Sequence, residues 1–199
     1  MSRWEPNARG RLEQAALELY RERGYEQTTV AEIAKRAGLT ERTFFRHFAD
    51  KREVLFPDAS PLEHFFVDTL NAVPAAATPF EAMAAVLAAV AALFRDRHEP
   101  SRQRRAVIAA NAELQERELV KLASLAAALA GTLRERGTAE PAASLTAETA
   151  VAVFRVAFDR WTSEEDETDL ARIMRDCLDE LRALTALSGA EDKVSRTGR

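Results

Sequence analysis

The sequence predicts an all-α protein, and three observations lead to that prediction. Glycine and proline are scarce, with 7 of each in 199 residues, whereas the helix-favouring residues Ala, Leu, Glu and Arg are abundant. Apolar residues recur three or four positions apart, which places them on one face of a helix. Helix-start signals, in which Thr is followed three positions later by Glu, precede two such segments, at Thr29–Glu32 and Thr78–Glu81.

The N-terminal part is expected to form short helices. A helix over about residues 7–23 has one apolar side and ends at a glycine. Two shorter helices, 29–37 and 40–48, each begin at a threonine and are separated by Gly38, which can adopt the positive φ that ends a helix. The capping pattern at 50–53 predicts that a further helix begins at once and runs to about residue 56.

The remaining chain is expected to form longer helices. Pro57 and Pro61 interrupt the chain, as either a flexible joint or a rigid offset. Later helices are expected over about residues 61–73, 79–97, 101–110 and 112–136, and two more begin near residues 146 and 163. With the pieces over 50–56 and 61–73 counted as one broken helix, this makes about nine helices in two domains, 1–56 and 57–187, followed by a polar, disordered tail over 188–199.

The helix over 40–48 has a polar outer side. Leu39, Phe44 and Phe48 point toward the core. The residues left on or near the opposite face are Glu41, Arg42, Thr43, Phe45, Arg46 and His47. A short helix that is held by its neighbours and presents guanidinium and polar groups fits the major groove of B-DNA.

These segments resemble the N-terminal helix-turn-helix domain of TetR-family transcriptional repressors. The resemblance rests on RERGYEQTT, AEIAKRAG, the Gly-Leu-Thr turn and FFRHFADK, and it covers about residues 8–56. Beyond residue 56 only the layout of helices is similar. The family usually carries Tyr where Phe45 stands, and the tyrosine hydroxyl bonds a DNA phosphate. Phe45 is therefore left with packing, for instance against a thymine methyl.

A double-stranded DNA operator is the expected partner. Arg42, Thr43 and Arg46 are candidates for base edges, because Arg bonds guanine with two donors, and Glu41 is a candidate acceptor from cytosine. The candidates for backbone phosphates are Thr28, Thr29, Thr40, His47 and Lys51. The alternative interpretation is an ordinary solvated helix surface.

The distribution of charge favours the same interpretation. The net charge of −4 argues at first against nucleic acid. Residues 1–56, however, hold 11 Lys and Arg against 9 Asp and Glu, and residues 57–199 hold 17 against 23. A locally basic domain can bind phosphate while the acidic remainder limits non-specific adhesion.

The C-terminal helices suggest a homodimer. The segment 150–158 is apolar on opposite sides, so one side can pack within its own subunit and the other against a second copy. The candidate interface residues are Val153, Val156, Ala157, Ile173, Met174, Cys177 and Leu181. Such a dimer is usual in the resembled family, and its two-fold symmetry implies a palindromic operator. The alternative is full burial in a monomeric core.

The resemblance also implies a small-molecule site in the C-terminal helices. Large aromatic residues that could line it are Phe65, Phe66, Phe94, Phe154, Phe158 and Trp161. Arg102, Arg104 and Arg105 could form a basic rim suited to a fatty acyl-coenzyme A, and the segment 101–129 is similar to C-terminal domains of acyl-CoA-responsive members, including the mycofactocin-associated type. The alternatives are an ordinary core and three solvated arginines.

Other classes of function find little support. Cys177 is the only cysteine, no apolar signal run begins the chain, and the longest uncharged apolar stretch, 82–94, is too short to span a bilayer. We therefore expect a soluble, cytoplasmic protein with no membrane partner. No catalytic pattern, metal-ligand set or cofactor motif is evident. The predicted function is a ligand-responsive repressor; the alternatives are an activator, a ligand-independent repressor and, remotely, a helical enzyme.

Overall fold

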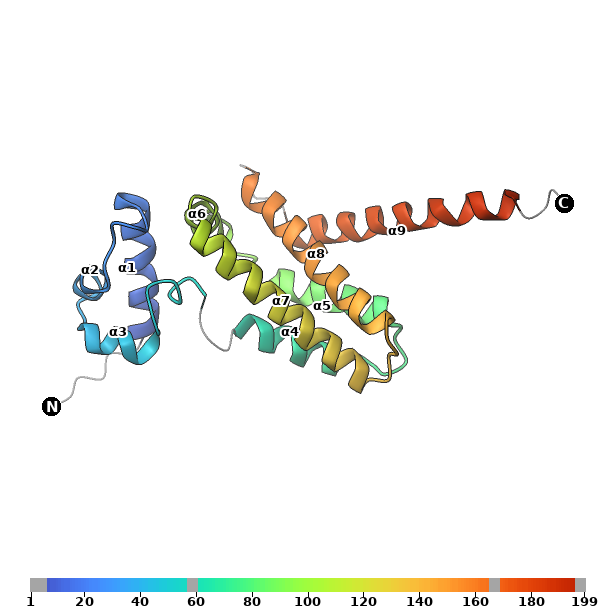
Figure 1. The fold of residues 1–199 in the computed structure, drawn as a ribbon, viewed down its shortest axis with the longest axis horizontal. Helices are drawn as coiled ribbons and strands as arrows, with labels where there is room; N and C mark the ends of the chain where they lie inside the picture. The colour runs from blue at the N-terminus through green and yellow to red at the C-terminus, as the bar shows by residue number, and fades with distance from the viewer. Residues whose placement is uncertain (1–6, 57–60, 165–168, 196–199) are drawn as a thin grey trace. The chain divides into compact units, whose positions relative to one another are not determined.

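The computed structural model describes residues 7–56, 61–164 and 169–195, and in them it contains nine α-helices and no β-strand (Figure 1). This confirms the all-α prediction. The helices are α1 (Ala8–Arg23), α2 (Val30–Arg36), α3 (Glu41–His47), α4 (Pro61–Ala72), α5 (Pro79–Leu93), α6 (His98–Ala109), α7 (Ala112–Glu135), α8 (Ala142–Ser163) and α9 (Leu170–Ser195). The predicted break at Pro57 falls on residues 57–60, which lie outside the described residues.

The chain folds as two compact units. The head unit comprises residues up to His64 together with 99–124, and therefore holds α1, α2, α3, most of α6 and the first half of α7. The body unit comprises 65–98 and the residues from Leu125 onward. The head unit is thus larger than the N-terminal segment 1–56 from which we expected a domain.

One hydrophobic core explains why 99–124 belongs to the head unit. On α1 the apolar residues recur at helical spacing and are buried, from Leu12 to Tyr20. Val107 and Ile108 of α6 and Leu114 of α7 join the same core. Its buried members are Leu12, Ala15, Ala16, Leu19, Tyr20, Tyr25, Ile33, Ala37, Phe44, Phe48, Val54, Leu55, Phe56, Val107, Ile108 and Leu114.

The local signals predict α2 and α3 correctly. Thr29 and Glu32 form a capping box at the start of α2, and Thr40 accepts the backbone N–H of Thr43 at 3.2 Å at the start of α3. Gly38 lies between the two helices with φ +66°, a conformation that side chains with a Cβ rarely adopt. These caps fix where α3 begins and so which of its residues face outward.

Residues 50–56 form turns and not the predicted helix. Asp50 accepts the N–H groups of Arg52 and Glu53 at 2.8 and 3.2 Å, as a cap would. The Glu53 side chain does not return to complete the capping box, because it contacts Arg117 on α7, 64 residues further along the chain. A long-range ion pair therefore replaces the local signal.

The body unit is built around α5, α8 and α9, each of which packs against the other two. Phe66 and Leu70 of α4, and Leu125, Leu129 and Leu133 of α7, complete its core. None of the described helices combines the length and the apolar character that a membrane-spanning helix requires.

The start of α8 differs from the prediction. α8 begins at Ala142, so Thr146 lies inside the helix and does not cap it. The Glu140 side chain accepts both the N–H and the hydroxyl of Ser144, at 3.3 and 2.9 Å, and thereby satisfies a first-turn donor.

Residues 188–195, which we expected to belong to a disordered tail, are helical. α9 continues through them to Ser195, and residues 196–199 lie outside the described part of the chain. Gly189 disfavours the helix by only about 1 kcal/mol relative to Ala, and the segment contains no proline that would end it.

Candidate nucleic-acid interface

The outer face of α3 carries the side chains that the sequence predicts there. Glu41, Arg42 and Arg46 are exposed, and Phe45 is 56% exposed, whereas Phe44 is fully buried in the head core. The Phe45 ring meets the Phe44 ring edge-on with centroids 5.4 Å apart. Because Phe45 follows Arg42 by three positions and directly precedes Arg46, the exposed ring and both guanidinium groups lie near one another on the helix surface.

The arginines of α3 differ from most basic residues around them. Within the described residues 7–56, the cations held by a hydrogen bond or ion pair are Arg9 (Glu13), Arg11 (Ala37 carbonyl), Arg23 (Glu32), Arg36 (Glu18 and Glu22), Lys51 (three carbonyls) and Arg52 (Asp50 and Glu113). In the same stretch, Arg21, Lys35, Arg42 and Arg46 make no such contact. Arg42 and Arg46 therefore keep all their donors for a guanine edge or a phosphate.

The threonines have different roles. Thr29 and Thr40 are exposed helix caps, and the Thr40 and Thr43 hydroxyls lie 3.0 Å apart, so one donates to the other. Thr28 is 1% exposed, and its hydroxyl donates to the Gly24 carbonyl at 2.8 Å. The Thr28 side chain thus closes the turn between α1 and α2, and its burial argues against the predicted phosphate contact.

The structure also argues against the predicted phosphate contact by Lys51. Its ammonium donates to the carbonyls of Tyr25, Glu26 and Thr28 at 2.9, 3.3 and 3.2 Å. The Nζ atom lies 4.2 Å from the centre of the Tyr25 ring, a cation–π contact. All three donors of the ammonium are thus committed to holding the α1–α2 turn.

His47 lies at the end of α3, where its imidazole is partly buried. Its Nε2 is buried and has no hydrogen-bond partner within the described residues. Burial, followed by the nearby charges of Arg46 and Arg9, lowers the pKa of the His47 imidazole below its ordinary value. The lowered pKa disfavours the charged imidazolium, and the burial of Nε2 argues against a phosphate contact through that atom.

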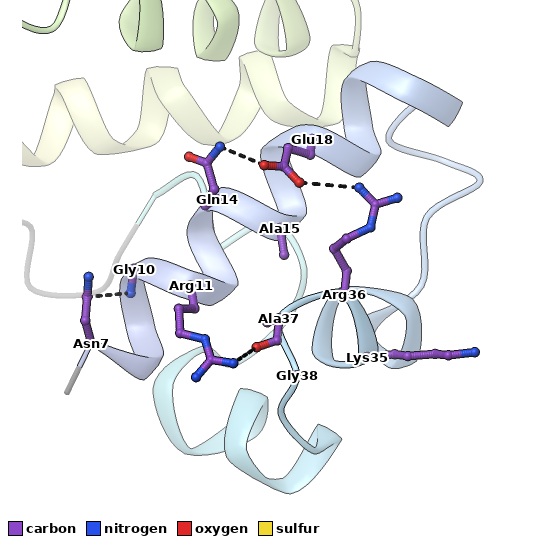
Figure 2. Close-up of a pocket in the computed structure, with 10 residues that line it drawn as sticks. All are labelled: Asn7, Gly10, Arg11, Gln14, Ala15, Glu18, Lys35, Arg36, Ala37 and Gly38. Atoms are coloured by element: carbon purple, nitrogen blue, oxygen red, sulfur yellow. Dashed lines mark hydrogen bonds and ion pairs between the residues drawn. The ribbon is translucent and has the colours of Figure 1, made fainter. Parts of the chain in front are cut away.

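A pocket between α1 and α2 is lined by charged residues, several of which pair with one another or with the backbone (Figure 2). Glu18 accepts from Gln14 at 2.8 Å and from Arg36 at 3.3 Å. Arg11 reaches the Ala37 carbonyl at the end of α2, where a cation is favoured by the helix dipole. In the same view the Lys35 side chain extends away from the other labelled residues, which leaves it accessible.

The aromatic residues predicted to line a ligand site cluster in the body unit. Ring centroids are 5.5 Å apart for Phe66–Phe154, 5.2 Å for Phe94–Phe158 and 5.5 Å for Phe158–Trp161. Phe65 is half-buried on α4. The structure thus brings five of the six rings into one contiguous aromatic cluster.

The predicted basic rim is not part of that cluster's unit. Arg102 and Arg105 belong to the head unit. Arg102 pairs with Glu99 at 2.8 Å, and Arg105 pairs with Glu118 at 3.4 Å. Their charges are therefore already partly neutralised by carboxylates of their own unit.

The predicted dimer residues separate into two groups. Val153, Ala157, Ile173 and Met174 are buried within the single chain, so they have little or no surface left for a partner. Periodicity identified them as apolar but could not show which side of each helix packs internally. The other three remain accessible: Val156 is 51% exposed, and Cys177 and Leu181 are half-buried.

Comparison with protein families covers both parts of the chain. Residues 13–56 match the model of bacterial regulatory proteins of the tetR family, and residues 77–186, more than half of the chain, match the model of the MftR C-terminal domain. The chain belongs to the TetR family. This confirms the resemblance to the family over residues 8–56 and the similarity to the mycofactocin-associated type in the C-terminal part.

Curated relatives of this TetR-family chain are also regulators by name. It is 42% identical over 88 residues to the HTH-type transcriptional regulator TcmR of Streptomyces glaucescens, a match that covers 44% of this chain and 39% of TcmR. It is 34% identical over 91 residues to the uncharacterized HTH-type regulator Rv2250c of Mycobacterium tuberculosis, covering 46% and 47%. The chain spans less than half the length of these curated relatives.

Solved structures of similar fold include two with bound small molecules. One is the transcriptional regulator FadR from Bacillus subtilis in complex with stearoyl-CoA, with 22% identity, a TM-score of 0.58, and coverage of 85% of this chain and 95% of FadR. The other is a SmeT–triclosan complex, with 21% identity, a TM-score of 0.62, and coverage of 89% and 90%. At these identities the two structures establish the shared fold.

Sequence reasoning missed two accessible cations of this TetR-family head unit. Lys35 on α2 and Arg21 on α1 are exposed and make no hydrogen bond or ion pair within the described residues. Lys35 lies opposite the apolar face of α2, so helical periodicity could have found it. The neighbouring Arg36 forms ion pairs with two glutamates of α1. Periodicity could not reveal those pairs, because the partners lie in another helix.

Proposed function

We propose that this TetR-family protein is a transcriptional repressor that binds an operator duplex with α3 in the major groove. The observation that carries the proposal is the outer face of α3, where Arg42 and Arg46 are exposed and uncommitted beside an exposed Phe45. Arg42 and Arg46 read base edges, Phe45 packs on an apolar base edge, and Lys35 contacts phosphate. Thr29 and Thr40 set the position of the two helices by capping them.

The protein acts as a homodimer on a palindromic operator. A two-fold dimer places two copies of α3 in successive major grooves, and each half-site repeats the other. Apolar side chains still exposed on the last two helices of the body unit, Leu145 and Val156 of α8 and Leu184 of α9, support this part of the proposal.

The effector is a small molecule with an apolar part, which binds in the body unit. The aromatic cluster around Phe154 offers an apolar lining, and the names of FadR with stearoyl-CoA and SmeT with triclosan indicate the kind of molecule to try first. Release requires that the effector bind the DNA-incompetent state more tightly than the DNA-bound state. A fatty acyl-CoA is therefore the first candidate.

The experiment begins with selection of operator fragments from genomic or random DNA. Affinities for the selected operator and for a random duplex are then compared at one salt concentration. Arg42→Ala and Arg46→Ala should each cost about 1–3 kcal/mol on the operator and far less on random DNA. Arg36→Ala is the matched control, because it removes the same charge from a residue already held by Glu18 and Glu22.

Equal losses on operator and random DNA from the two α3 variants would refute base reading. Failure to enrich any fragment would refute DNA recognition as a whole. Adding stearoyl-CoA, stearate or triclosan to the preformed complex tests the effector, since the proposal requires an apolar effector to lower operator affinity.

A further inference from the structure

A buried carboxylate ties the segment that follows α3 to α7 within the head unit. The Glu53 side chain is only 4% exposed. Its Oε1 contacts the Arg117 guanidinium, and its Oε2 lies 3.6 Å from the Lys121 ammonium. Arg117 and Lys121 are one helical turn apart on α7, so both point toward the same carboxylate.

Three further contacts join the same segment to α6 and α7. Arg52 pairs with Glu113 at 2.9 Å. Arg104 donates from Nε to the Leu55 carbonyl at 3.1 Å, and its guanidinium lies 4.9 Å from the centre of the Phe56 ring. Contacts at four residues, Arg52, Glu53, Leu55 and Phe56, therefore hold this segment against helices that lie some fifty to sixty residues further along the chain.

The segment is equally well joined to the helices that carry the DNA-binding face. The Tyr20 hydroxyl donates to the Lys51 carbonyl at 2.6 Å, and the Lys51 ammonium holds the turn before α2. Val54, Leu55 and Phe56 share one core with Phe44 and Phe48 of the α3 region. Residues 50–56 thus contact both α7, through ion pairs, and the α3 region, through the shared core.

Because the Glu53 carboxylate is buried, its stability depends on the cations that pair with it. A carboxylate removed from water is unfavourable unless it is paired, and breaking one partner of a buried pair is strongly destabilising. Arg117 and Lys121 of α7 therefore favour the buried position of Glu53. Loss of either cation makes that position less favourable for the carboxylate.

We propose that Arg117 and Lys121 are positioning residues for DNA binding, which act through Glu53 and do not touch DNA themselves. This inference rests on the proposed function. Without the ion pairs between Glu53 and α7, α3 is held less rigidly. DNA binding must then order α3, and the entropy lost in doing so lowers the affinity for DNA. Because no phosphate contact is lost, the dependence of affinity on salt is unchanged.

The test measures operator affinity, salt slope and thermal unfolding for the full chain and for Arg117→Gln, Glu53→Gln and the double variant. Arg117→Gln should weaken operator binding about five-fold or more with an unaltered salt slope. The double variant should be no weaker than Arg117→Gln alone, because the carboxylate that Arg117 neutralises is then absent. Arg117→Lys should recover much of the affinity.

Arg134→Gln is the matched control. It makes the same substitution on the same helix and breaks an exposed ion pair with Glu140, 2.7 Å long, in the body unit. Its operator affinity should stay within about two-fold of the parent.

Each outcome decides between the possibilities. Parent-like affinity of Arg117→Gln, or losses that simply add in the double variant, would overturn the inference. A salt slope reduced by about one would also overturn it, because Arg117 would then contact phosphate directly. Absence of operator binding by the parent chain would instead overturn the proposed function. If Arg117→Gln unfolds, the operator affinity and salt slope of Arg117→Lys and of the double variant provide the same test.

Discussion

At the scale of single residues, the same type of side chain has different roles, which depend on the groups that it contacts. Arg36 and Arg42 are both exposed arginines of the head unit, but Arg36 is held by two glutamates and Arg42 by no side chain within the described residues. The sequence predicted the outward direction of Arg42 and Arg46 because periodicity fixes the face of a short helix. It did not reveal that three carbonyls hold the Lys51 ammonium, because those carbonyls lie some twenty-five residues earlier in the chain.

Lys51→Met tests the structural role of that ammonium. The substitution removes three hydrogen bonds and one cation–π contact, and we expect it to lower the free energy of unfolding by about 1.5–3 kcal/mol in chemical denaturation. The salt slope of DNA binding should not change. Lys35→Met is the control, because Lys35 is exposed and should change stability by less than about 0.5 kcal/mol. A reduced salt slope with unchanged stability for Lys51→Met would contradict this role.

At the scale of elements, local signals located helices well where the helix ends are satisfied locally. Both capping boxes and the turn at Gly38 lie where the sequence predicted them. The predictions failed where a distant or unrecognised side chain intervened, as at Glu53, which pairs with α7, and at the start of α8, where Glu140 satisfies the first turn. Short-range patterns carry no information about such partners.

Thr78→Ala tests the local rule on α5. Thr78 accepts the N–H of Glu81 at 3.3 Å, and α5 supplies much of the body core, so loss of the cap should lower the free energy of unfolding by about 1 kcal/mol. Thr78→Ser keeps the hydroxyl and should cost much less. Equal losses for both variants, measured by urea denaturation, would show that the methyl group matters and not the cap.

At the scale of the whole molecule, the structure redefines which surface is left for a partner. Four of the seven residues predicted for the dimer are buried inside the chain, and the exposed apolar residues of the body helices include Leu145 (63%), Val156 (51%) and Leu184 (60%). Exposed leucine and valine on neighbouring helices are costly in a monomer and favourable in an interface. The dimer proposal therefore moves to the accessible side of α8.

Leu145→Glu and Val156→Glu test that surface. Each places a charge where the proposed dimer would exclude water, so we expect the dissociation constant of the dimer to rise about ten-fold or more, as measured by analytical ultracentrifugation. Leu119→Glu on α7 of the head unit is the control, since Leu119 is equally exposed at 61%. Dimers that persist in both α8 variants, or that dissociate in the control, would place the interface elsewhere.

The sequence by itself determined the all-α fold, the capped α2 and α3, and the outward face that carries Arg42, Phe45 and Arg46. These features depend on interactions within a few residues, which helical spacing and capping patterns record directly. Only the tertiary structure decided which cations are committed to partners, which apolar faces are already covered, and that α6 and α7 complete the head core. Those features depend on pairs such as Glu53 and Arg117, far apart in the chain and brought together only when the core forms.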